Sequence, residues 1–364
     1  MNKLLLIHLL TVAFQVRVHS GQSEKPVYLP EFSLQGTDGR FYSNKDFEEN
    51  DLLAVIFLSN HCKISQLFQN QLIKIAKLMR DKKVAIVAVS PNYDKAVLPD
   101  EQAYSDLGDS FIEMKKRALR KNYNFPYLFD GEKQTFTRKM GVKITPSVFL
   151  YNKNREMVYA GRIGNHDLPE SLESSDLYKF IISYLDRGGN KYKRTKVFGT
   201  AIKFSDDLLL AEQVRKRYSD ETVRITAADE RKLKFYLNHK TGKPKLFYVW
   251  KETDTDLRDN LITISTLYKI FRKRGLKLIT VCISERQNTD SAIEALEQAQ
   301  LSSTNFMVSG NQVSPLTTII PADISSITPF YRLIGGDGKM LQGEKGKIEK
   351  DDLRLQILSA LNKN

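Results

Sequence analysis

The sequence is poor in the residues that build disulfide-rich or metal-stabilised scaffolds. Of its 364 residues only two are cysteines, Cys62 and Cys282, which excludes a disulfide-dense scaffold and a thiolate-rich zinc or iron–sulfur site. The 19 glycines and 11 prolines are too few for a collagen-like or proline-rich chain. After the first 20 residues, no apolar run approaches the roughly 20 residues that span a bilayer. The 41% of hydrophobic residues suffice for a buried core, and the length predicts two domains.

The first 21 residues have the pattern of a secretory signal peptide. A basic residue, Lys3, precedes the apolar stretch Leu4–Phe14, and the small residues Ser20 and Gly21 follow. The alternatives are a buried N-terminal strand and a retained membrane anchor. We expect residues 1–21 to be removed and the mature chain, without a transmembrane segment, to be extracytoplasmic (periplasmic or secreted). Disulfides persist in such compartments, so two cysteines indicate that bridging does not stabilise this protein.

The chain is basic, with a formal net charge of +13. Basic clusters occur at 115–117, 120–121 and 191–196, and one explanation is a nucleic acid or another anionic surface as partner. However, 43 acidic residues are interspersed, and no RNA-binding signature, helix-turn-helix spacing or zinc-finger spacing accompanies the charge. We interpret the excess as a solvated lysine-rich surface and predict no nucleic-acid partner.

Residues 22–204 show the order of strands and helices expected of one α/β domain. Continuous apolar runs predict buried strands, and apolar residues at helical spacing predict helices. The pattern predicts strands at 52–58 and 84–90, helices at 67–79, 109–122 and 177–185, and a hairpin over 147–161. A charged helical connector is predicted at 205–239.

Residues 240–364 repeat this order as a second unit. The pattern predicts strands at 246–250 and 276–284, helices at 261–271 and 352–361, and a hairpin over 330–341. The tripeptide Ile144-Thr145-Pro146 recurs as Ile327-Thr328-Pro329, at an offset of 183 residues, and the same offset relates Met157 to Met340. We infer an internal duplication of one fold.

A cysteine and a Thr-Pro pair mark the candidate site of the first unit. Cys62 follows the first central strand in the pattern Ser59-x-x-Cys62, where a helix is predicted to begin. Unpaired N–H groups and the helix dipole at such a position stabilise a thiolate and lower the pKa of a cysteine. Thr145-Pro146 begins a later strand, and taken alone it is also compatible with an ordinary strand start.

In this order, these motifs resemble the redoxin family (alkyl hydroperoxide reductase/thiol-specific antioxidant), in the peroxiredoxin-like branch of the thioredoxin superfamily. The resemblance covers residues 28–204 and is carried by Asn60-His61-Cys62, Phe125-Pro126-Tyr127-Leu128, Thr145-Pro146, Tyr159-Ala160-Gly161-Arg162-Ile163 and Gly199-Thr200-Ala201-Ile202-Lys203. It implies an α/β protein of tandem thioredoxin-like folds, each a central mixed sheet flanked by helices. The second unit resembles a degenerate thioredoxin-like domain in pattern only.

The resemblance also implies the geometry of the site. Thr145-Pro146 is expected to hold a cis peptide bond opposite Cys62 and to present a backbone edge that receives an extended peptide. Pro329 is expected to be cis as well. Ser59 is expected to donate a hydrogen bond to the Cys62 thiolate.

The departures from the family pattern restrict the chemistry. Ser59 and Thr200 stand where the family has its first site cysteine and its late cysteine, so an intramolecular dithiol–disulfide cycle is impossible here. Ser-x-x-Cys resembles the Thr/Ser-x-x-Cys of true peroxiredoxins. However, Val55 replaces their proline, and Lys143 is the one counterpart of their later arginine.

One-thiol chemistry is the remaining redox function. A Cys62 thiolate attacks a peroxide to give a sulfenic acid, or a disulfide to give a mixed disulfide, and an external thiol resolves either product. We predict an oxidoreductase without a cofactor, whose partners are an external thiol reductant or a protein disulfide. The sequence does not indicate the oligomeric state. The alternatives are a non-enzymatic protein that binds peptides or partner proteins at the cis-proline groove, with Cys62 a relic, and adhesion to an acidic surface.

Two further residues near these motifs are interpreted as structural. His61 is expected to cap the helix or to face solvent rather than to tune Cys62. Cys282 lies in the middle of an apolar strand and is expected to be an inert core cysteine, and we expect no bridge between Cys282 and Cys62.

The second unit has no sulfur at the position equivalent to Cys62, so we exclude redox catalysis there and expect a binding or scaffolding role. Glu252, Asp254 and Asp256 follow its first strand, and alternating acids at a helix start are predicted to be caps and dipole partners rather than a cation site. The histidines of the mature chain are too dispersed to predict a metal site.

Overall fold

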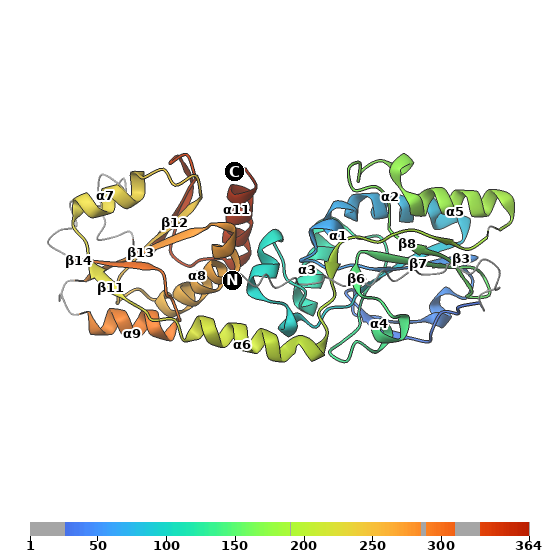
Figure 1. Cartoon of the computed structure of the whole chain (residues 1–364), viewed down its shortest axis with the longest axis horizontal. Helices are drawn as coiled ribbons and strands as arrows, with labels where there is room; N and C mark the ends of the chain where they lie inside the picture. Colours follow the sequence, from blue (N-terminus) through green and yellow to red (C-terminus); the bar gives the residue numbers. More distant parts are fainter. Residues whose placement is uncertain (1–25, 190, 285–288, 310–327, 364) are drawn as a thin grey trace, which may run out of the picture.

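The computed structural model describes residues 26–189, 191–284, 289–309 and 328–363. These residues form two α/β halves that are joined along one side by helix α6 (Leu208–Ser219) (Figure 1). Each half has a mixed sheet with helices on its faces, which confirms the predicted fold class. The predicted signal peptide, residues 1–21, lies outside the described residues. Among the helices that the structure describes, none is both long and apolar enough to cross a membrane.

An eight-stranded sheet forms the centre of the first half, in the order β2-β1-β5-β4-β3-β7-β8-β9. The central strand β3 (Leu52–Phe57) is parallel to β4 (Val84–Ser90) and antiparallel to β7 (Ser147–Tyr151). The other strands are β1 (Ser33–Gly36), β2 (Phe41–Ser43), β5 (Tyr127–Phe129), β8 (Met157–Gly161) and β9 (Lys193–Arg194). A separate two-stranded sheet pairs β6 (Ile144–Thr145) with β10 (Thr200–Ala201).

Alternate residues of β3 serve two cores, because successive side chains of a strand point to opposite faces. Leu52, Ala54 and Ile56 pack with residues of α2, α3 and α5, whereas the residues between them pack toward α4. Figure 1 shows α2 and α5 on one face of this sheet and α4 on the other. The helices are α1 (Lys63–Leu67), α2 (Gln69–Met79), α3 (Phe111–Lys121), α4 (Thr135–Met140) and α5 (Asp176–Arg187).

The second half has a six-stranded sheet in the order β11-β14-β13-β12-β15-β16. Its strands are β11 (Ile225–Ala227), β12 (Lys245–Trp250), β13 (Lys277–Ser284), β14 (Thr304–Ser309), β15 (Phe330–Ile334) and β16 (Met340–Lys345). Its helices are α7 (Glu230–Asn238), α8 (Leu257–Phe271), α9 (Asp290–Gln298) and α11 (Lys350–Asn362). Residues of α8, α9 and α11 share one core and those of α7 the other.

Five strands have the same order and relative direction in both halves: β5-β4-β3-β7-β8 corresponds to β14-β13-β12-β15-β16. The sequence offset of 183 residues holds in the structure, because β7 and β15 begin at Ser147 and Phe330, and β8 and β16 begin at Met157 and Met340. The peptide bonds before Pro146 and Pro329 are both cis, as predicted. Ile327, part of the repeated tripeptide, lies outside the described residues.

The segment 205–239, expected to be a helical connector, also supplies a strand to the second half. It contains α6 and α7, and between them Ile225–Ala227 forms β11, which pairs in parallel with β14 at the edge of the sheet. Of this segment, α6 alone therefore runs between the halves, and the domain boundaries inferred from the sequence stay a prediction.

Candidate functional site

Cys62 occupies the centre of the candidate site, at the carboxyl end of β3. It is the N-cap residue of α1, and its sulfur accepts a hydrogen bond from the backbone N–H of Ser65 at 3.4 Å. The thiol donates to the carbonyl oxygen of Thr145 at 3.1 Å. Cys62 forms no disulfide and is 0% exposed. The site is therefore closed to solvent in this structure.

The four residues predicted to form the site lie together. Thr145 and the cis Pro146 stand opposite Cys62, and the hydroxyl of buried Ser59 lies 2.9 Å from the hydroxyl of Thr145. Ser59 was expected to donate to the Cys62 sulfur, but its hydroxyl pairs with the Thr145 hydroxyl instead. Ser59 thus supports Thr145, and Thr145 contacts the sulfur.

Thr200, at the position of the family's late cysteine, is a further member of the site. In the β10–β6 pair it lies opposite Thr145, and its side chain contributes to the lowered pKa of Cys62. The approach requires glycine at position 199, because a Cβ there would lie 1.9 Å from the Thr145 carbonyl oxygen. The backbone edge expected to receive a peptide is thus already paired with β10 of the same chain.

These contacts determine the acidity of the thiol. Burial alone raises the pKa of Cys62, since a thiolate is less stable away from water. The hydrogen bonds from the side chains of Thr200 and Ser65, the Ser65 N–H and Thr145 outweigh burial, so the pKa of Cys62 is lower than that of an ordinary cysteine. The site therefore makes the thiolate easier to form than in an ordinary cysteine.

His61 does not face solvent, contrary to the sequence-based expectation. It is 2% exposed, and its Nδ1 pairs with the Oδ2 of buried Asp109. Burial lowers the pKa of His61, but the Asp109 carboxylate, together with Cys62, outweighs burial and raises it. Conversely, the pKa of Asp109 is held below its usual range by His61 and by backbone N–H donors, against the effect of burial. A buried ion pair therefore lies next to the thiol in sequence and in space.

Asp109 was missed in the sequence, although its neighbours hold it firmly. Its Oδ1 accepts the backbone N–H of Asn60 at 2.5 Å, and its Oδ2 accepts the side-chain amide of Asn92 at 3.0 Å. The signals available were a histidine next to the site cysteine and a carboxylate at the start of a predicted helix. Neither reveals a contact across 48 residues.

The equivalent position of the second half lacks these features. Asp254 accepts the backbone N–H of Lys251 at 2.7 Å, and Asp256 is the N-cap residue of α8 without a side-chain cap hydrogen bond. Burial raises the pKa of Cys282, in β13, to about 12, which agrees with an inert core cysteine. Within the described ranges, no group of His, Cys, Asp and Glu side chains could hold a metal ion.

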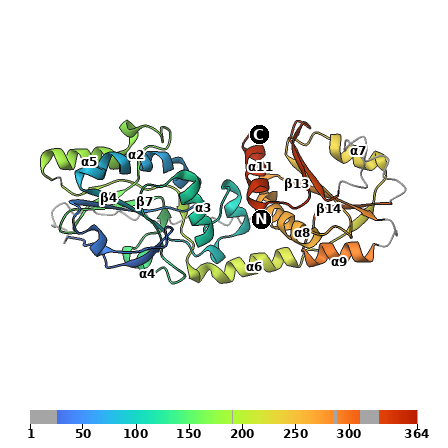
Figure 2. The same ribbon diagram turned by 180° about the vertical axis from the view of Figure 1, so that it is seen from behind.

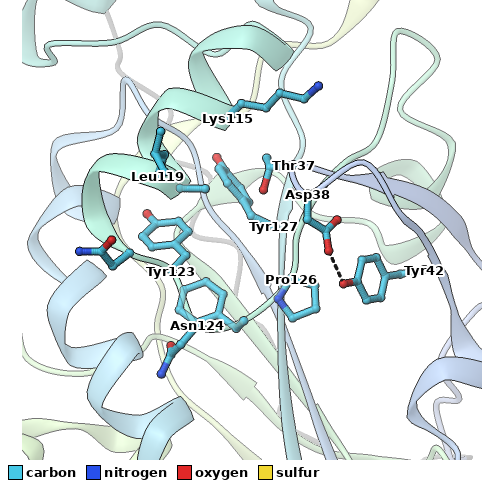
Figure 3. A pocket seen from close by; sticks show the side chains of 12 residues that line it. Thr37, Asp38, Tyr42, Lys115, Leu119, Tyr123, Asn124, Pro126 and Tyr127 are labelled. Carbon is cyan, nitrogen blue, oxygen red and sulfur yellow. Dashed lines mark hydrogen bonds between the residues drawn. The ribbon is translucent and has the colours of Figure 1, made fainter.

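Two of the cavities that the described residues form are lined by the first half alone. The larger, of about 590 Å³, is bounded by the turn after β1, by α3 and by the loop before β5 (Figure 3). None of the four predicted site residues lines it, and it touches the site only through Tyr127, whose hydroxyl lies 3.5 Å from Asn60 Oδ1. The other cavity, of about 430 Å³, adjoins the cis proline through Ile144 and Ser147. Its lining includes three exposed basic residues, Lys143, Arg194 and Lys196, and no carboxylate.

Comparison with known proteins gives a family match for the first half. Residues 22–179 match the Redoxin family model, so the chain carries a Redoxin domain there. The search of curated proteins found no match.

Several solved structures are similar to part of the chain. A hypothetical protein from Sinorhizobium meliloti is 24% identical over 50% of this chain and 96% of its own, with a TM-score of 0.43. Peroxidoxin BcpB from Mycobacterium tuberculosis is 14% identical over 36% of this chain and 81% of its own (TM-score 0.29). The thioredoxin domain of a thiol-disulfide oxidoreductase from Bacteroides vulgatus is 13% identical over 44% and 96% (TM-score 0.33).

Proposed function

We propose that this protein is an exported oxidoreductase that reduces small peroxides through the single thiol of Cys62, and that an external thiol regenerates it. The observation that carries the proposal is the place of Cys62: it is the N-cap residue of α1, it lies opposite the cis Thr145-Pro146 bond, and its sulfur accepts the Ser65 backbone N–H. These surroundings lower the pKa of the thiol. Hydrogen bonds to a charged group are stronger than those between neutral groups. The site therefore stabilises the nucleophilic form of the thiol.

Access to the sulfur favours a peroxide over a protein disulfide. Cys62 is fully buried, and β10 covers the edge of β6. Because β10 is only two residues long, a small local opening admits a molecule the size of hydrogen peroxide. A protein disulfide must bring its backbone to the same edge, which requires β10 to leave.

The reaction needs one nucleophile and two equivalents of an external thiol. The Cys62 thiolate attacks one peroxide oxygen, the O–O bond breaks, and the products are the Cys62 sulfenic acid and hydroxide, which takes up a proton to become water. A thiol then displaces water from the sulfenic acid to give a mixed disulfide. A second thiol releases the Cys62 thiol and an external disulfide.

His61 is suited to supply the proton. Its raised pKa keeps the ring protonated to a higher pH than that of an unperturbed histidine. Asp109 holds Nδ1, whereas Nε2 is buried and has no hydrogen-bond partner among the described residues. The Nε2–H group can therefore be donated to the departing hydroxide.

The reductant we propose is an anionic low-molecular-weight thiol. The 430 Å³ cavity next to Thr145-Pro146 is lined by Lys143, Arg194 and Lys196, and clustered cations attract carboxylates. We expect Arg194→Glu to slow the resolution of the sulfenic acid by glutathione and to leave resolution by neutral 2-mercaptoethanol unchanged. An unchanged rate with glutathione in the variant, or an equal slowing with both thiols, would contradict this choice of reductant.

The alternative of a peptide-binding module gains less support. Its groove would be the β6 edge, and that edge is already paired with Thr200 and Ala201. A peptide that binds there must displace β10, which approaches β6 closely because position 199 is a glycine.

The direct test is to trap the sulfenic acid. The reduced full chain is exposed to hydrogen peroxide with dimedone, digested, and read by mass spectrometry. We expect the adduct on Cys62, none on Cys282, which serves as an internal control, and none at position 62 in Cys62→Ser. An unmodified Cys62 in the folded chain, with adduct formed after unfolding, would refute the proposal; a reaction with glutathione disulfide alone would refute the preference for peroxide.

A further inference from the structure

One segment of the first half lies against the second half. Residues Pro99–Tyr104 form a 3-10 helix between β4 and α3, and Figures 1 and 2 show the region before α3 facing α8 and α11. Ala103, only 1% exposed, belongs to the hydrophobic core that α8, α9 and α11 form. The segment therefore packs as part of the second half, and a few residues later the same chain supplies Asp109 to the site of the first half.

Arg354, on α11, hydrogen-bonds to this segment and to the residue that follows it. Its side chain is 1% exposed, and its Nε donates to the carbonyl oxygen of Ser105 at 2.9 Å. One terminal nitrogen donates to the carbonyl oxygen of Gln102 at 3.1 Å, and the other lies 3.5 Å from Glu113 Oε1. A buried guanidinium is costly unless it is well paired, and here its partners all belong to the first half.

Two hydrogen bonds lead from Glu113 to the site. Glu113 Oε1 accepts the backbone N–H of Gly108 at 2.8 Å. The Gly108 carbonyl accepts the side-chain amide of Asn60 at 2.7 Å, and Asn60 also donates its backbone N–H to Asp109. The carboxylate that pairs with His61 therefore follows directly after a residue held by Glu113.

A second route runs through Arg274. Its guanidinium donates to the Ala103 carbonyl at 2.7 Å and lies over the Tyr104 ring, 4.5 Å from the ring centre. The Tyr104 carbonyl accepts the side-chain amide of Gln66 at 3.2 Å, and the same amide donates to the Asn60 carbonyl at 2.9 Å. Both routes end at Asn60, next to His61 and Cys62 in the chain.

We propose that the second half of the chain acts as a positioning domain for the Cys62 site, and that Arg354 is its positioning residue, holding the loop that carries Asp109 against His61. This inference rests on the proposed redox role of Cys62. However, the pairing of His61 with Asp109 can be measured without any turnover, so a failure of this proposal can be distinguished from a failure of the proposed redox function.

The charges around the pair fix the direction of the effect. The charges of Asp109, Cys62 and Glu101 raise the pKa of His61, and Arg354 is subject to the charges of Glu113, Asp106, Asp351 and Asp109. If Arg354 no longer holds the loop, the Asp109 carboxylate loses its fixed place. The protonated form of His61 then loses stability, and with it the thiolate of Cys62.

The test compares three variants of the full chain. Arg354→Met removes the guanidinium group and its charge. Arg354→Lys keeps a positive charge, but an ammonium group cannot reproduce the planar arrangement of guanidinium donors. Lys245→Met is the matched control, because Lys245 is also buried and donates to three backbone carbonyls, all within the second half: Tyr236, Leu237 and His239. The readouts are the NMR titrations of ¹³Cε1 of His61 and ¹³Cβ of Cys62, assigned with His61→Gln and Cys62→Ser.

We expect Arg354→Met to lower the apparent pKa of His61 and raise that of Cys62, each by about half a unit or more, with Arg354→Lys in between and Lys245→Met as wild type. Wild-type titrations in Arg354→Met would overturn the proposal, as would equal shifts in Lys245→Met. If Arg354→Met does not fold, Arg354→Lys decides: a shift in the same directions supports the proposal, and an unchanged titration contradicts it. Absence of peroxide reactivity in the wild type would refute the function and leave these titrations informative.

Discussion

Thr200 lies directly opposite Thr145 in the β10–β6 pair, and its side chain is the strongest of the influences that lower the pKa of Cys62. The family's late cysteine is thereby replaced by a hydroxyl that stabilises the remaining thiolate. We expect Thr200→Val, which keeps the shape and removes the hydroxyl, to raise the pKa of Cys62 by about one unit. A ¹³Cβ titration of Cys62 measures this. Thr266→Val, on α8 in the other half, is the control, and an unchanged pKa in Thr200→Val would contradict the role of Thr200.

The same contact predicts that a disulfide can be restored. A side chain that reaches the Cys62 sulfur places its Cβ near the distance that a disulfide requires. We expect mild oxidation of Thr200→Cys to join positions 62 and 200, seen as a cross-linked peptide in a non-reducing digest. Thr266→Cys should remain unlinked. A Thr200→Cys chain that stays reduced would show that β10 is displaced from Cys62 in solution.

A substitution of Gly199 tests whether β10 controls access to the Cys62 thiol. A Cβ at this position would lie 1.9 Å from the Thr145 carbonyl oxygen, so Gly199→Ala must push β10 away from β6. We expect alkylation of Cys62 by a bulky maleimide to accelerate by on the order of tenfold, the equivalent of about 1.4 kcal/mol in the opening equilibrium.

The control for Gly199→Ala is Gly131→Ala. Gly131 also has a positive φ, but a Cβ there meets nothing within 4 Å. This variant introduces backbone strain without displacing β10, so it should leave the alkylation rate of Cys62 unchanged. Equal acceleration in both variants would mean that general destabilisation exposes the thiol.

The His61–Asp109 pair makes stability depend on pH in two directions. The pKa of His61 is raised in the folded state, so its contribution is complete below the unfolded value of about 6.5 and is lost as the pH rises through the folded value. The pKa of Asp109 is lowered, so its contribution is present above about 3.9 and is lost as the pH falls through the folded value.

We therefore expect Asp109→Asn to lower the free energy of unfolding by about 3 kcal/mol between about pH 4 and pH 6.5, and by less at higher pH. Urea unfolding of the wild type and the variant at several pH values measures the difference. In a His61→Gln background the pH dependence of this difference should disappear. A difference that is constant from pH 4 to pH 9 would show that the pair is not ionised in the folded chain.

Much of the fold could be predicted because its strands carry strong local signals. The apolar runs that became β3, β4, β12 and β13 leave little choice of structure, and the repeated Thr-Pro pair indicated the repeated order of elements. The short strands β9, β10 and β11 were missed, since segments of two or three residues have no periodicity. Their pairing depends on partners far away in the sequence.

The site could be predicted where it follows from position on the chain. Cys62, Ser59 and Thr145 are in place because a helix start and a strand start meet at the end of a central strand. His61 was misjudged because its burial depends on Asp109, on a loop whose course the sequence does not indicate. The role of Arg354 could not be predicted either, since nothing local to α11 shows that a buried arginine reaches into the other half.

Whether the site tunes Cys62 as a redox thiol is decided by the pH titration of its ¹³Cβ signal in the folded full chain. With two cysteines in the sequence, Cys62→Ser assigns the signals. We expect an apparent pKa of Cys62 below the unperturbed value of about 8.5, and a Cys282 signal that does not titrate in the same range. A Cys62 pKa at or above that value would mean that the site does not stabilise the thiolate, and Cys62 would then be a relic of the family's chemistry.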